Sequence, residues 1–296
     1  MYWHAVLPFP SAWCGLYCVL LSISFFSTLD YLLKGIRPPT AVESKGPLAV
    51  WKWRNMLISW LHALIIGTWD ILCFYYYPEL MDDPIGHIVP FTYYMVAVST
   101  GYFFYDFWDM LVQKQIFSMW ELTLHHIAVL GAFTYNVINV RYIAYNVIAL
   151  LAEVNSIFLH TRKLMQMYKI HPMNIIRRLN SLINLITFIC CRGFALFCIS
   201  YGIYMNPDKI SSFYSFLLMS SMFIMNILNP ILFYILLRND FLLTHKEIND
   251  YYSINDRKKL IDTTYTLDNK KSNYKLTYEL NSFTVNRFHQ SNSSKL

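Results

Sequence analysis

The sequence predicts an all-α integral membrane protein, a polytopic helical bundle with about seven (six to seven) transmembrane helices. Of its 296 residues, 56% are hydrophobic and 14% are charged, whereas a soluble domain has about 25% charged residues. The apolar residues form several runs of about 18–25 residues, long enough for a helix to cross roughly 30 Å of hydrocarbon. Clusters of turn-favouring residues separate these runs. Together, these observations exclude a soluble enzyme.

Seven apolar runs mark the predicted spans, and residues that disfavour continued helix separate several of them. The spans are expected at about 11–33, 55–77, 88–111, 121–138, 142–161, 181–204 and 212–237. The first connection is interrupted by Arg37-Pro38-Pro39 and Gly46-Pro47, the second by Asp82-Asp83-Pro84 and the sixth by Asn206-Pro207-Asp208. Cleavage of the first run as a signal peptide is an alternative to an anchor. No Lys or Arg precedes that run, which favours the anchor.

This pattern divides the chain into three regions. Residues 1–50 are expected to form an N-terminal membrane anchor and the first basic loop, and residues 51–238 the helical core domain. Residues 239–296 are rich in Asn, Ser, Lys and Tyr and poor in apolar runs. Such a composition does not bury enough apolar surface to offset the entropy of ordering the chain. We therefore expect a cytosolic tail with little fixed structure.

Basic residues set the expected orientation, because Lys and Arg beside membrane spans stay on the cytoplasmic side. The basic residues of the first and fifth loops are Lys34, Arg37, Lys45, Lys52 and Arg54, and Arg162, Lys163, Lys169, Arg177 and Arg178. The second loop carries Glu79, Asp82 and Asp83 but no Lys or Arg. We therefore expect the odd-numbered loops and the tail in the cytosol, with the N-terminus outside the cell or in a lumen.

Charge and cysteine usage exclude further classes of protein. The net charge of +6 comes from short loops and the tail rather than from one face, so no nucleic-acid partner is expected. All six Cys residues lie in apolar runs, without a pair of C-x-x-C motifs. We therefore expect neither a disulfide framework nor a metal site, and no cofactor.

Polar residues inside the predicted spans are the candidate site residues, because an ionisable group in hydrocarbon normally faces a partner or a wet cavity. In chain order they are His62, Asp70, Asp106, Asp109, Glu121, His125, His126, Glu153, Asn155, His160, Arg192, Asn226 and Asn229. The guanidinium of Arg192 needs a partner, for which Glu153 or Asp106 is the natural choice.

Helical spacing groups two sets of these residues. Asp106 and Asp109 lie three positions apart on one face, which favours either a paired-carboxylate proton or metal site or two acids at the end of a span, capped by water and Lys114. Glu153 and His160 lie seven positions apart, again on one face. Their polar stripe indicates either hydrogen bonding between helices or the lining of a ligand site.

The adjacent pair His125 and His126 is the sharpest feature of the sequence. Neighbouring helix positions are about 100° apart, so the two rings cannot bind one metal as an i, i+4 pair would. One of the two His residues is expected to face a polar interior, where its imidazole is able to act as a general base. Glu121 lies on the same face of the helix as His125. A structurally satisfied His pair is the alternative.

The chain resembles the TLC-domain family. The resemblance rests on the double His in the segment Trp120–Ile127 (WELTLHHI), on Arg141 and on the segment Glu153–His160 (EVNSIFLH), and it covers roughly residues 52–237. With Gly101-Tyr102-Phe103 and Tyr105-Asp106, the chain looks similar to the calfacilitin-type subgroup, TLC domain-containing proteins one and two. The resemblance implies a TLC-domain helical bundle around a cavity that accommodates lipid.

The resemblance to ceramide synthases is incomplete. Their motif continues to a His-Asp pair and a further Asp that are tied to acyl transfer, whereas the corresponding region here reads ALLAEVN over residues 149–155. His125 and His126 match the double His of the family, and Glu153 is at best a substitute for the missing carboxylates. Ceramide synthesis is therefore not the expected activity.

Three functions follow as hypotheses. The leading one, implied by the resemblance, is a lipid-homeostasis protein that regulates phospholipid acyl composition and membrane fluidity, at the plasma membrane or alternatively in the endoplasmic reticulum. Its partner would be a phospholipid or acyl chain, with His125, His126 and Glu153 near the polar end of the cavity. The second is an acyl-CoA-dependent lipid acyltransferase with one of the two His as general base. The third is a channel regulator or cargo receptor that acts on a membrane protein through its basic loops and tail.

Overall fold

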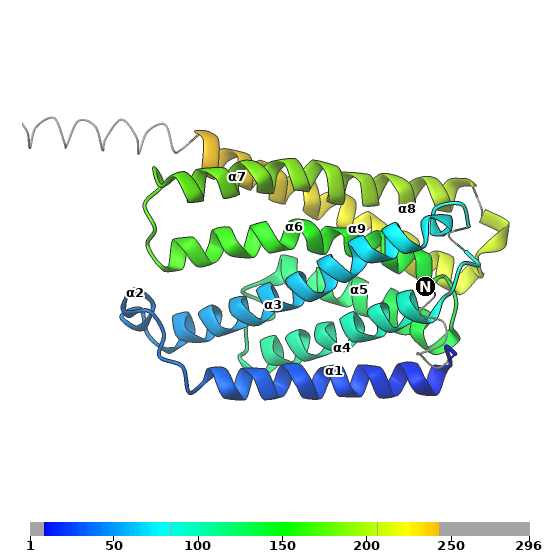
Figure 1. The fold of residues 1–296 in the computed structure, drawn as a ribbon, viewed down its shortest axis with the longest axis horizontal. Coiled ribbons are helices and arrows are strands. Elements are labelled where there is room, and N and C mark those ends of the chain that lie inside the picture. The colour runs from blue at the N-terminus through cyan, green and yellow to red at the C-terminus, as the bar shows by residue number, and fades with distance from the viewer. Residues whose placement is uncertain (1–8, 84, 206, 243–296) are drawn as a thin grey trace, which may run out of the picture. The chain divides into compact units, whose positions relative to one another are not determined.

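The computed structural model describes residues 9–83, 85–205 and 207–242, and these residues contain helices but no strands. Seven long helical rods run side by side (Figure 1). They are α1 (Ala12–Leu33), α3 (Pro47–Tyr76), α4 (Pro90–Val112), α5 (Trp120–Asn139), α6 (Ile143–Met167), the continuous rod of α7 (Ile175–Thr187), η3 (Phe188–Gly193) and α8 (Phe194–Met205), and α9 (Ser212–Leu237). Four short helical turns are α2 (Thr40–Glu43), η2 (Pro78–Leu80), η4 (Pro207–Lys209) and η5 (Arg238–Leu242).

Five of these rods are long and apolar enough to cross a membrane: α1, α3, α6, the rod from α7 to α8, and α9. This result confirms the prediction of a polytopic helical membrane protein. Helices α4 and α5 have 23 and 20 residues, which is also long enough to span the hydrocarbon. They are not among the five apolar rods, and their side chains include Asp106 and Asp109 on α4 and Glu121, His125 and His126 on α5. Their membrane crossing therefore stays a prediction.

Three predicted boundaries are wrong, because the helices run further than the apolar runs inside them; one of these is the end of α6, at Met167 rather than at residue 161. Helix α3 begins at Pro47, not at residue 55. Proline is tolerated in the first turn of a helix, where its missing N–H has no acceptor, and Gly46 supplies the turn before it with a φ of 90°. The sixth rod begins at Ile175 rather than at residue 181, because the Asn174 side chain caps it by accepting a 2.9 Å bond from the N–H of Ile176.

Three helix pairs form the main contacts of the bundle: α3 with α6, α1 with α4, and α5 with α9. Glycine allows the first two pairs to approach closely. A Cβ added to Gly67 on α3 would lie 3.1 Å from the backbone nitrogen of Val154 on α6, and one added to Gly101 on α4 would lie 2.5 Å from the carbonyl oxygen of Val19 on α1. These pairs hold the polar residues of α3, α4 and α6 in one interior.

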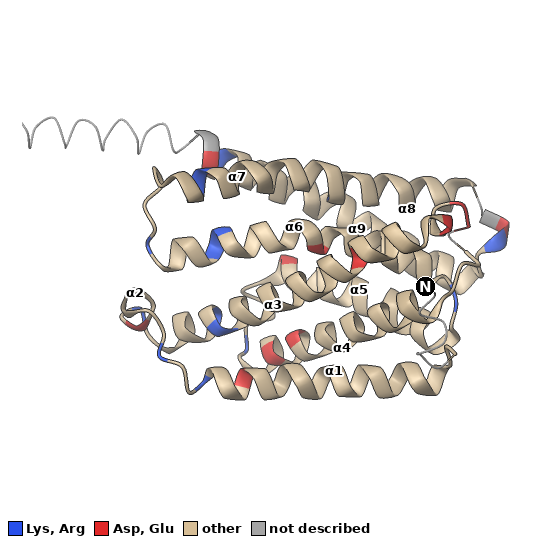
Figure 2. Ribbon diagram, in the orientation of Figure 1, with Lys and Arg blue, Asp and Glu red and all other residues tan. Residues whose placement is uncertain are grey.

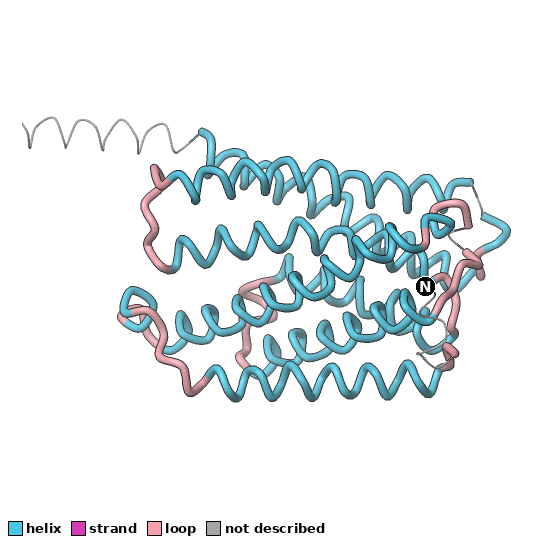
Figure 3. The backbone as a smooth tube through the Cα atoms, viewed as in Figure 1, coloured by secondary structure: helices cyan, strands magenta, loops and turns pink. Residues whose placement is uncertain are grey.

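Charged residues are distributed unevenly along the bundle. Most Lys and Arg residues gather toward the end where α1 stops and α3 starts, while Glu79, Asp82 and Asp83 belong to a connection at the other end (Figure 2). The connecting loops lie toward these two ends (Figure 3). This distribution is what the orientation prediction requires, and the sidedness itself stays a prediction. The predicted unstructured tail lies almost entirely outside the described residues.

Candidate functional site

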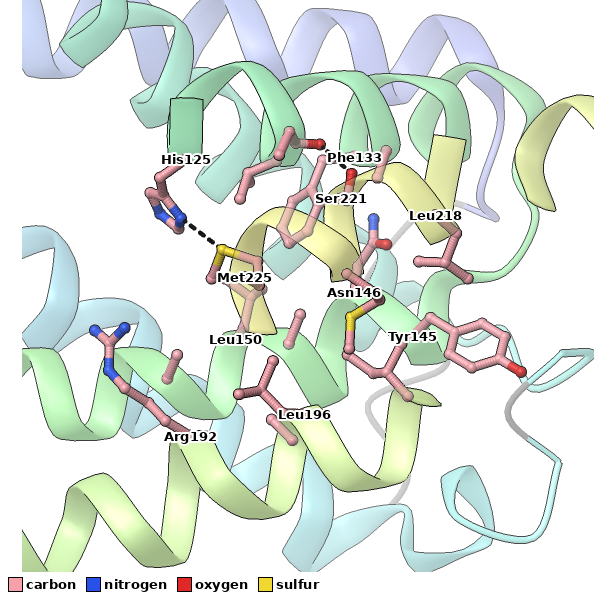
Figure 4. Close-up of a pocket in the computed structure, with 18 of the residues that line it drawn as sticks. His125, Phe133, Tyr145, Asn146, Leu150, Arg192, Leu196, Leu218, Ser221 and Met225 are labelled. Carbon is pink, nitrogen blue, oxygen red and sulfur yellow. Dashed lines mark hydrogen bonds between the residues drawn. The ribbon is translucent and has the colours of Figure 1, made fainter. Parts of the chain in front are cut away.

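A cavity that is partly open to the outside lies between α4, α5, α6, η3, α8 and α9, and the empty space in and in front of it amounts to about 740 Å³. Its walls are mostly aliphatic and aromatic, with Phe103, Ala128, Val129, Ala132, Phe133, Ala149, Leu150, Ala152, Ala195, Leu196, Ile199, Leu218, Met222 and Met225. Its polar lining residues are His125, Tyr145, Asn146, Glu153, Arg192, Ser221 and Asn229. His125 and Arg192 lie on one side of the cavity and Tyr145 on the other (Figure 4). An apolar pocket with a few convergent polar groups is typical of a small-molecule site.

The two residues of the double His lie in different surroundings: one lines this cavity, and the other packs between helices. His125 lines the cavity, and its Nδ1 lies 3.2 Å from the sulfur of Met225 on α9 (Figure 4). His126 points toward α4, where its Nε2 lies 2.8 Å from Oδ2 of Asp106. Adjacent helix positions diverge by about 100°, which is why two neighbouring rings reach different surroundings. The Nε2 of His125 makes no hydrogen bond to another described residue, so it is the imidazole nitrogen available to a ligand.

Both nitrogens of His126 are occupied. Its Nδ1 lies 2.8 Å from the carbonyl oxygen of Leu122, and a carbonyl only accepts hydrogen bonds. Nδ1 therefore carries a proton and donates it, while Nε2 faces the Asp106 carboxyl group. With only 2% of its surface exposed, His126 has no free nitrogen with which to take a proton from a ligand. This geometry favours His125 over His126 as the group that contacts a ligand.

Asp106 and Asp109 share a face of α4, as predicted, and an amide bridges them. The Nδ2 of Asn55 on α3 donates to Asp106 at 2.5 Å and to Asp109 at 3.5 Å. Asp109 also accepts a 2.7 Å bond from the indole N–H of Trp51. Asp106 is only 3% exposed, so the interpretation of two acids capped by water and Lys114 is wrong for this residue: its partners come from α3 and α5.

The polar stripe on α6 divides between two sets of partners. Glu153 lines the cavity, and its Oε2 lies 3.7 Å from Nδ1 of His62 on α3. Asn155 is buried, and its amide nitrogen donates to the Asn184 side chain on α7 at 2.9 Å. His160 is half-buried and makes no hydrogen bond to another residue in the described part of the chain. The stripe therefore combines the two roles that the sequence left open, with Glu153 at the cavity and Asn155 between helices.

Arg192 makes no direct ion pair with Glu153 or Asp106, although the charges of Arg192 and Glu153 interact over a longer distance. Within the described residues, no carboxylate lies within 4.0 Å of it. Its guanidinium donates to neutral oxygens on α6 and α9: Asn155 Oδ1 at 2.7 Å, Ser156 Oγ at 2.9 Å and Asn229 Oδ1 at 3.3 Å. Arg192 lies in the π-helical turn η3. Such turns shift the register of side chains and are common at functional sites, and the helical periodicity of the sequence did not predict this one.

Glu121 is separated from the other candidates. The sequence places it four positions before His125, on the same face of α5. Because α5 begins at Trp120, Glu121 lies in the first turn, where it is exposed and does not line the cavity. His62 was a candidate to which the sequence assigned no partner or role. This residue is 1% exposed, stacks on Tyr102 with ring centroids 3.7 Å apart and lies 3.2 Å from the Ser99 hydroxyl. The sequence signal for it was a lone His in an apolar span.

Comparison with known proteins identifies this arrangement of helices. The profile of the TLC domain (TRAM_LAG1_CLN8) matches residues 52–238, a range that contains the double His and every residue lining the cavity. The chain belongs to the TLC-domain family. It is 36% identical over 226 residues to TLC domain-containing protein 2 of Danio rerio, covering 76% of this chain and 90% of that protein.

Further relatives extend this result. The chain is 32% identical over 167 residues to TLC domain-containing protein 1 of Mus musculus, which covers 56% of this chain and 67% of that protein. It is 28% identical over 212 residues to TLC domain-containing protein 1 of Homo sapiens, which covers 71% of this chain and 84% of that protein. No solved structure matches the chain.

Helix α1 precedes the matched TLC domain but packs against it, since the Tyr93 hydroxyl on α4 donates to the carbonyl of Ser11 at 2.9 Å.

Proposed function

We propose that this TLC-domain protein regulates the acyl composition of phospholipids, and thereby membrane fluidity, by binding an acyl chain or lipid in the cavity. The observation that carries the proposal is a cavity whose walls are mostly apolar, with a few polar groups of which His125 and Arg192 share one side. Hydrocarbon fits the apolar walls, because burying it there removes apolar surface from water. The side with His125 and Arg192 suits a headgroup, because a few convergent polar groups in an apolar pocket fix the orientation of a ligand.

A second candidate function is acyl transfer from acyl-CoA to a lipid acceptor. The observation in its favour is that His125 lines the cavity with its Nε2 unoccupied, which suits a general base that accepts a proton from a hydroxyl or amine. His126 does not suit this role, because Asp106 and the Leu122 carbonyl occupy its nitrogens. Absence of transfer from labelled acyl-CoA to sphingoid and lysophospholipid acceptors, with purified protein that still binds lipid, would exclude this function.

The proposed location is the plasma membrane, with the endoplasmic reticulum as the alternative. The named relatives and the apolar rods support a multi-pass membrane protein, and the compartment is part of the proposal. Microscopy of the tagged protein against markers of both membranes distinguishes the two.

The deciding experiment compares lipid species in cells whose own gene is silenced. Cells are restored with wild type, with His125→Ala or with Leu124→Ala, a control on the same helix whose side chain is 38% exposed. Mass spectrometry of phospholipids and ceramides at equal expression is the measurement. We expect a change in phospholipid acyl chains that wild type and Leu124→Ala reverse and His125→Ala does not.

The other outcomes favour the competing functions. A change in ceramides would support acyl transfer. Unchanged lipids would contradict both lipid functions and favour a protein-contact role, in which the basic loops and the tail matter. A chain truncated after residue 242 tests that role directly, since it retains the cavity.

A further inference from the structure

Arg192 presents unused hydrogen-bond donors at the wall of the cavity. A guanidinium has five N–H donors, and three of them bond to Asn155, Ser156 and Asn229. Two N–H groups therefore remain for a ligand. The bonds to α6 and α9, together with the Phe188 ring 5.6 Å from the guanidinium carbon, hold this group in place before any ligand arrives.

The charge of Arg192 also lacks a direct counter-ion in the described part of the chain. All three acceptors are neutral oxygens. Glu153 lines the same cavity and attracts the guanidinium, but it lies more than 4.0 Å from it and therefore leaves the free N–H groups without a direct acceptor. An unpaired charge in a low-dielectric interior is expensive, and an intramembrane ionisable group usually marks a ligand or ion pathway. An anion in the cavity would supply a direct counter-charge.

We infer that the cavity binds a single-chain lipid whose head is an oxyanion, a carboxylate or a phosphate, held by the two free N–H groups of Arg192. The planar guanidinium matches both anions, because two parallel N–H groups can bond to two oxygens of one group. His125 lies on the same side of the cavity (Figure 4), so its free Nε2 is placed to contact the same head. The acyl chain would lie along Leu196, Ile199 and Leu218. This inference rests on the proposed function and names the chemistry of its ligand.

Binding to the purified full-length protein in nanodiscs tests the inference. The probes are oleate, oleoyl lysophosphatidate and oleyl alcohol, which share one chain and differ in the head. We expect at least one of the two anions to bind about tenfold or more tightly than the alcohol, a difference typical of one desolvated charge contact. Oleate and lysophosphatidate together show whether the preferred head is the carboxylate or the phosphate.

Variants then assign the preference to one residue. Arg192→Gln is expected to remove the preference for anions and leave binding of oleyl alcohol unchanged. Arg178→Gln is the matched control, because it removes an exposed cation from the same rod at its far end. Leu196→Trp fills the apolar part of the cavity and should weaken binding of all three probes.

The outcomes separate the inference from the proposed function. Equal binding of the alcohol and both anions, unaffected by Arg192→Gln but weakened by Leu196→Trp, would overturn the anion assignment and leave a lipid cavity. Absence of binding by every probe would overturn both. If Arg192→Gln does not fold, the comparison of heads on the wild-type protein still decides the inference.

Discussion

Nε2 of His126 on α5 and Oδ2 of Asp106 on α4 lie 2.8 Å apart, with both side chains buried. The contact links α4 to α5, and it points His126 away from the cavity that His125 lines. It assigns different tasks to the two His residues: His126 joins helices, and His125 faces the cavity. The predictions below follow from this division and from the packing around it.

Replacing His126 with Ala is expected to destabilise the protein far more than replacing His125. The variant leaves the Asp106 carboxyl group buried without its imidazole partner, and breaking a buried pair in this way typically costs about 3–5 kcal/mol. His125→Ala removes a contact with a thioether and edge-to-face ring contacts with Phe103 and His126, and it leaves no buried charge without a partner. Thermal unfolding of the purified variants in one detergent measures the difference.

Asp106→Asn is a second test of the same pair, because it keeps the size of the side chain and changes its hydrogen-bonding groups. We expect Asp106→Asn to lower the stability by part of the amount that His126→Ala does. Combining both changes should lower the stability little further, since the two residues act through one contact. Equal destabilisation by His125→Ala and His126→Ala would contradict the division of roles.

Much of the fold could be predicted from the sequence, because hydropathy and turn residues report on local structure. All seven predicted runs form rods, and the last one matches α9 from Ser212 to Leu237. The starts of α3 and α7 were missed because Lys52 and Arg177 interrupt the apolar pattern inside the helix. Long basic side chains near the ends of a span extend toward the membrane surface, so they mark the end of the apolar run but not the end of the helix.

The site could be predicted only in part. Periodicity along one helix correctly placed Asp106 and Asp109 on one face. It did not indicate that Asn55 would bridge them, because that contact depends on the packing of α3 against α4. For the same reason, Arg192 was assigned a carboxylate partner, whereas the π-helical turn directs it to Asn155 and Ser156. Partners on other helices require the tertiary structure.

Gly101→Ala is expected to destabilise the bundle by about 1–3 kcal/mol, the usual effect of overpacking. The added methyl group would lie 2.5 Å from the Val19 carbonyl oxygen and from the Cβ of Ser22, so α1 and α4 must separate. Gly193→Ala is the matched control, because its Cβ would meet nothing within 4 Å. Thermal unfolding should show a lower stability for Gly101→Ala and an unchanged stability for Gly193→Ala. Equal effects would mean that α1 does not pack against α4 as described.

Asp70→Leu is expected to stabilise the protein. Asp70 on α3 is 0% exposed, and both of its carboxyl oxygens lack a hydrogen-bond partner within the described residues. A buried polar group without a partner costs about 1–3 kcal/mol, and leucine removes that penalty with a side chain of similar size. Asp106→Leu is the control, because it should destabilise by depriving Asn55 and His126 of their acceptor. If thermal unfolding shows that Asp70→Leu and Asp106→Leu both lower the stability, Asp70 has a partner in the membrane.

Filling the cavity should abolish function without loss of stability. Ala195 on α8 lines the cavity and is 5% exposed, so Ala195→Phe would occupy space that we assign to an acyl chain. Ile189→Phe is the control on the same rod, because this side chain is 58% exposed and lies outside the cavity lining. In silenced cells, Ala195→Phe should fail to restore the phospholipid profile, like His125→Ala, while Ile189→Phe restores it. Both variants should be expressed and unfold as wild type does. If Ala195→Phe restores the profile, the protein acts on lipids without a lipid in this cavity. That outcome would favour a role for the basic loops.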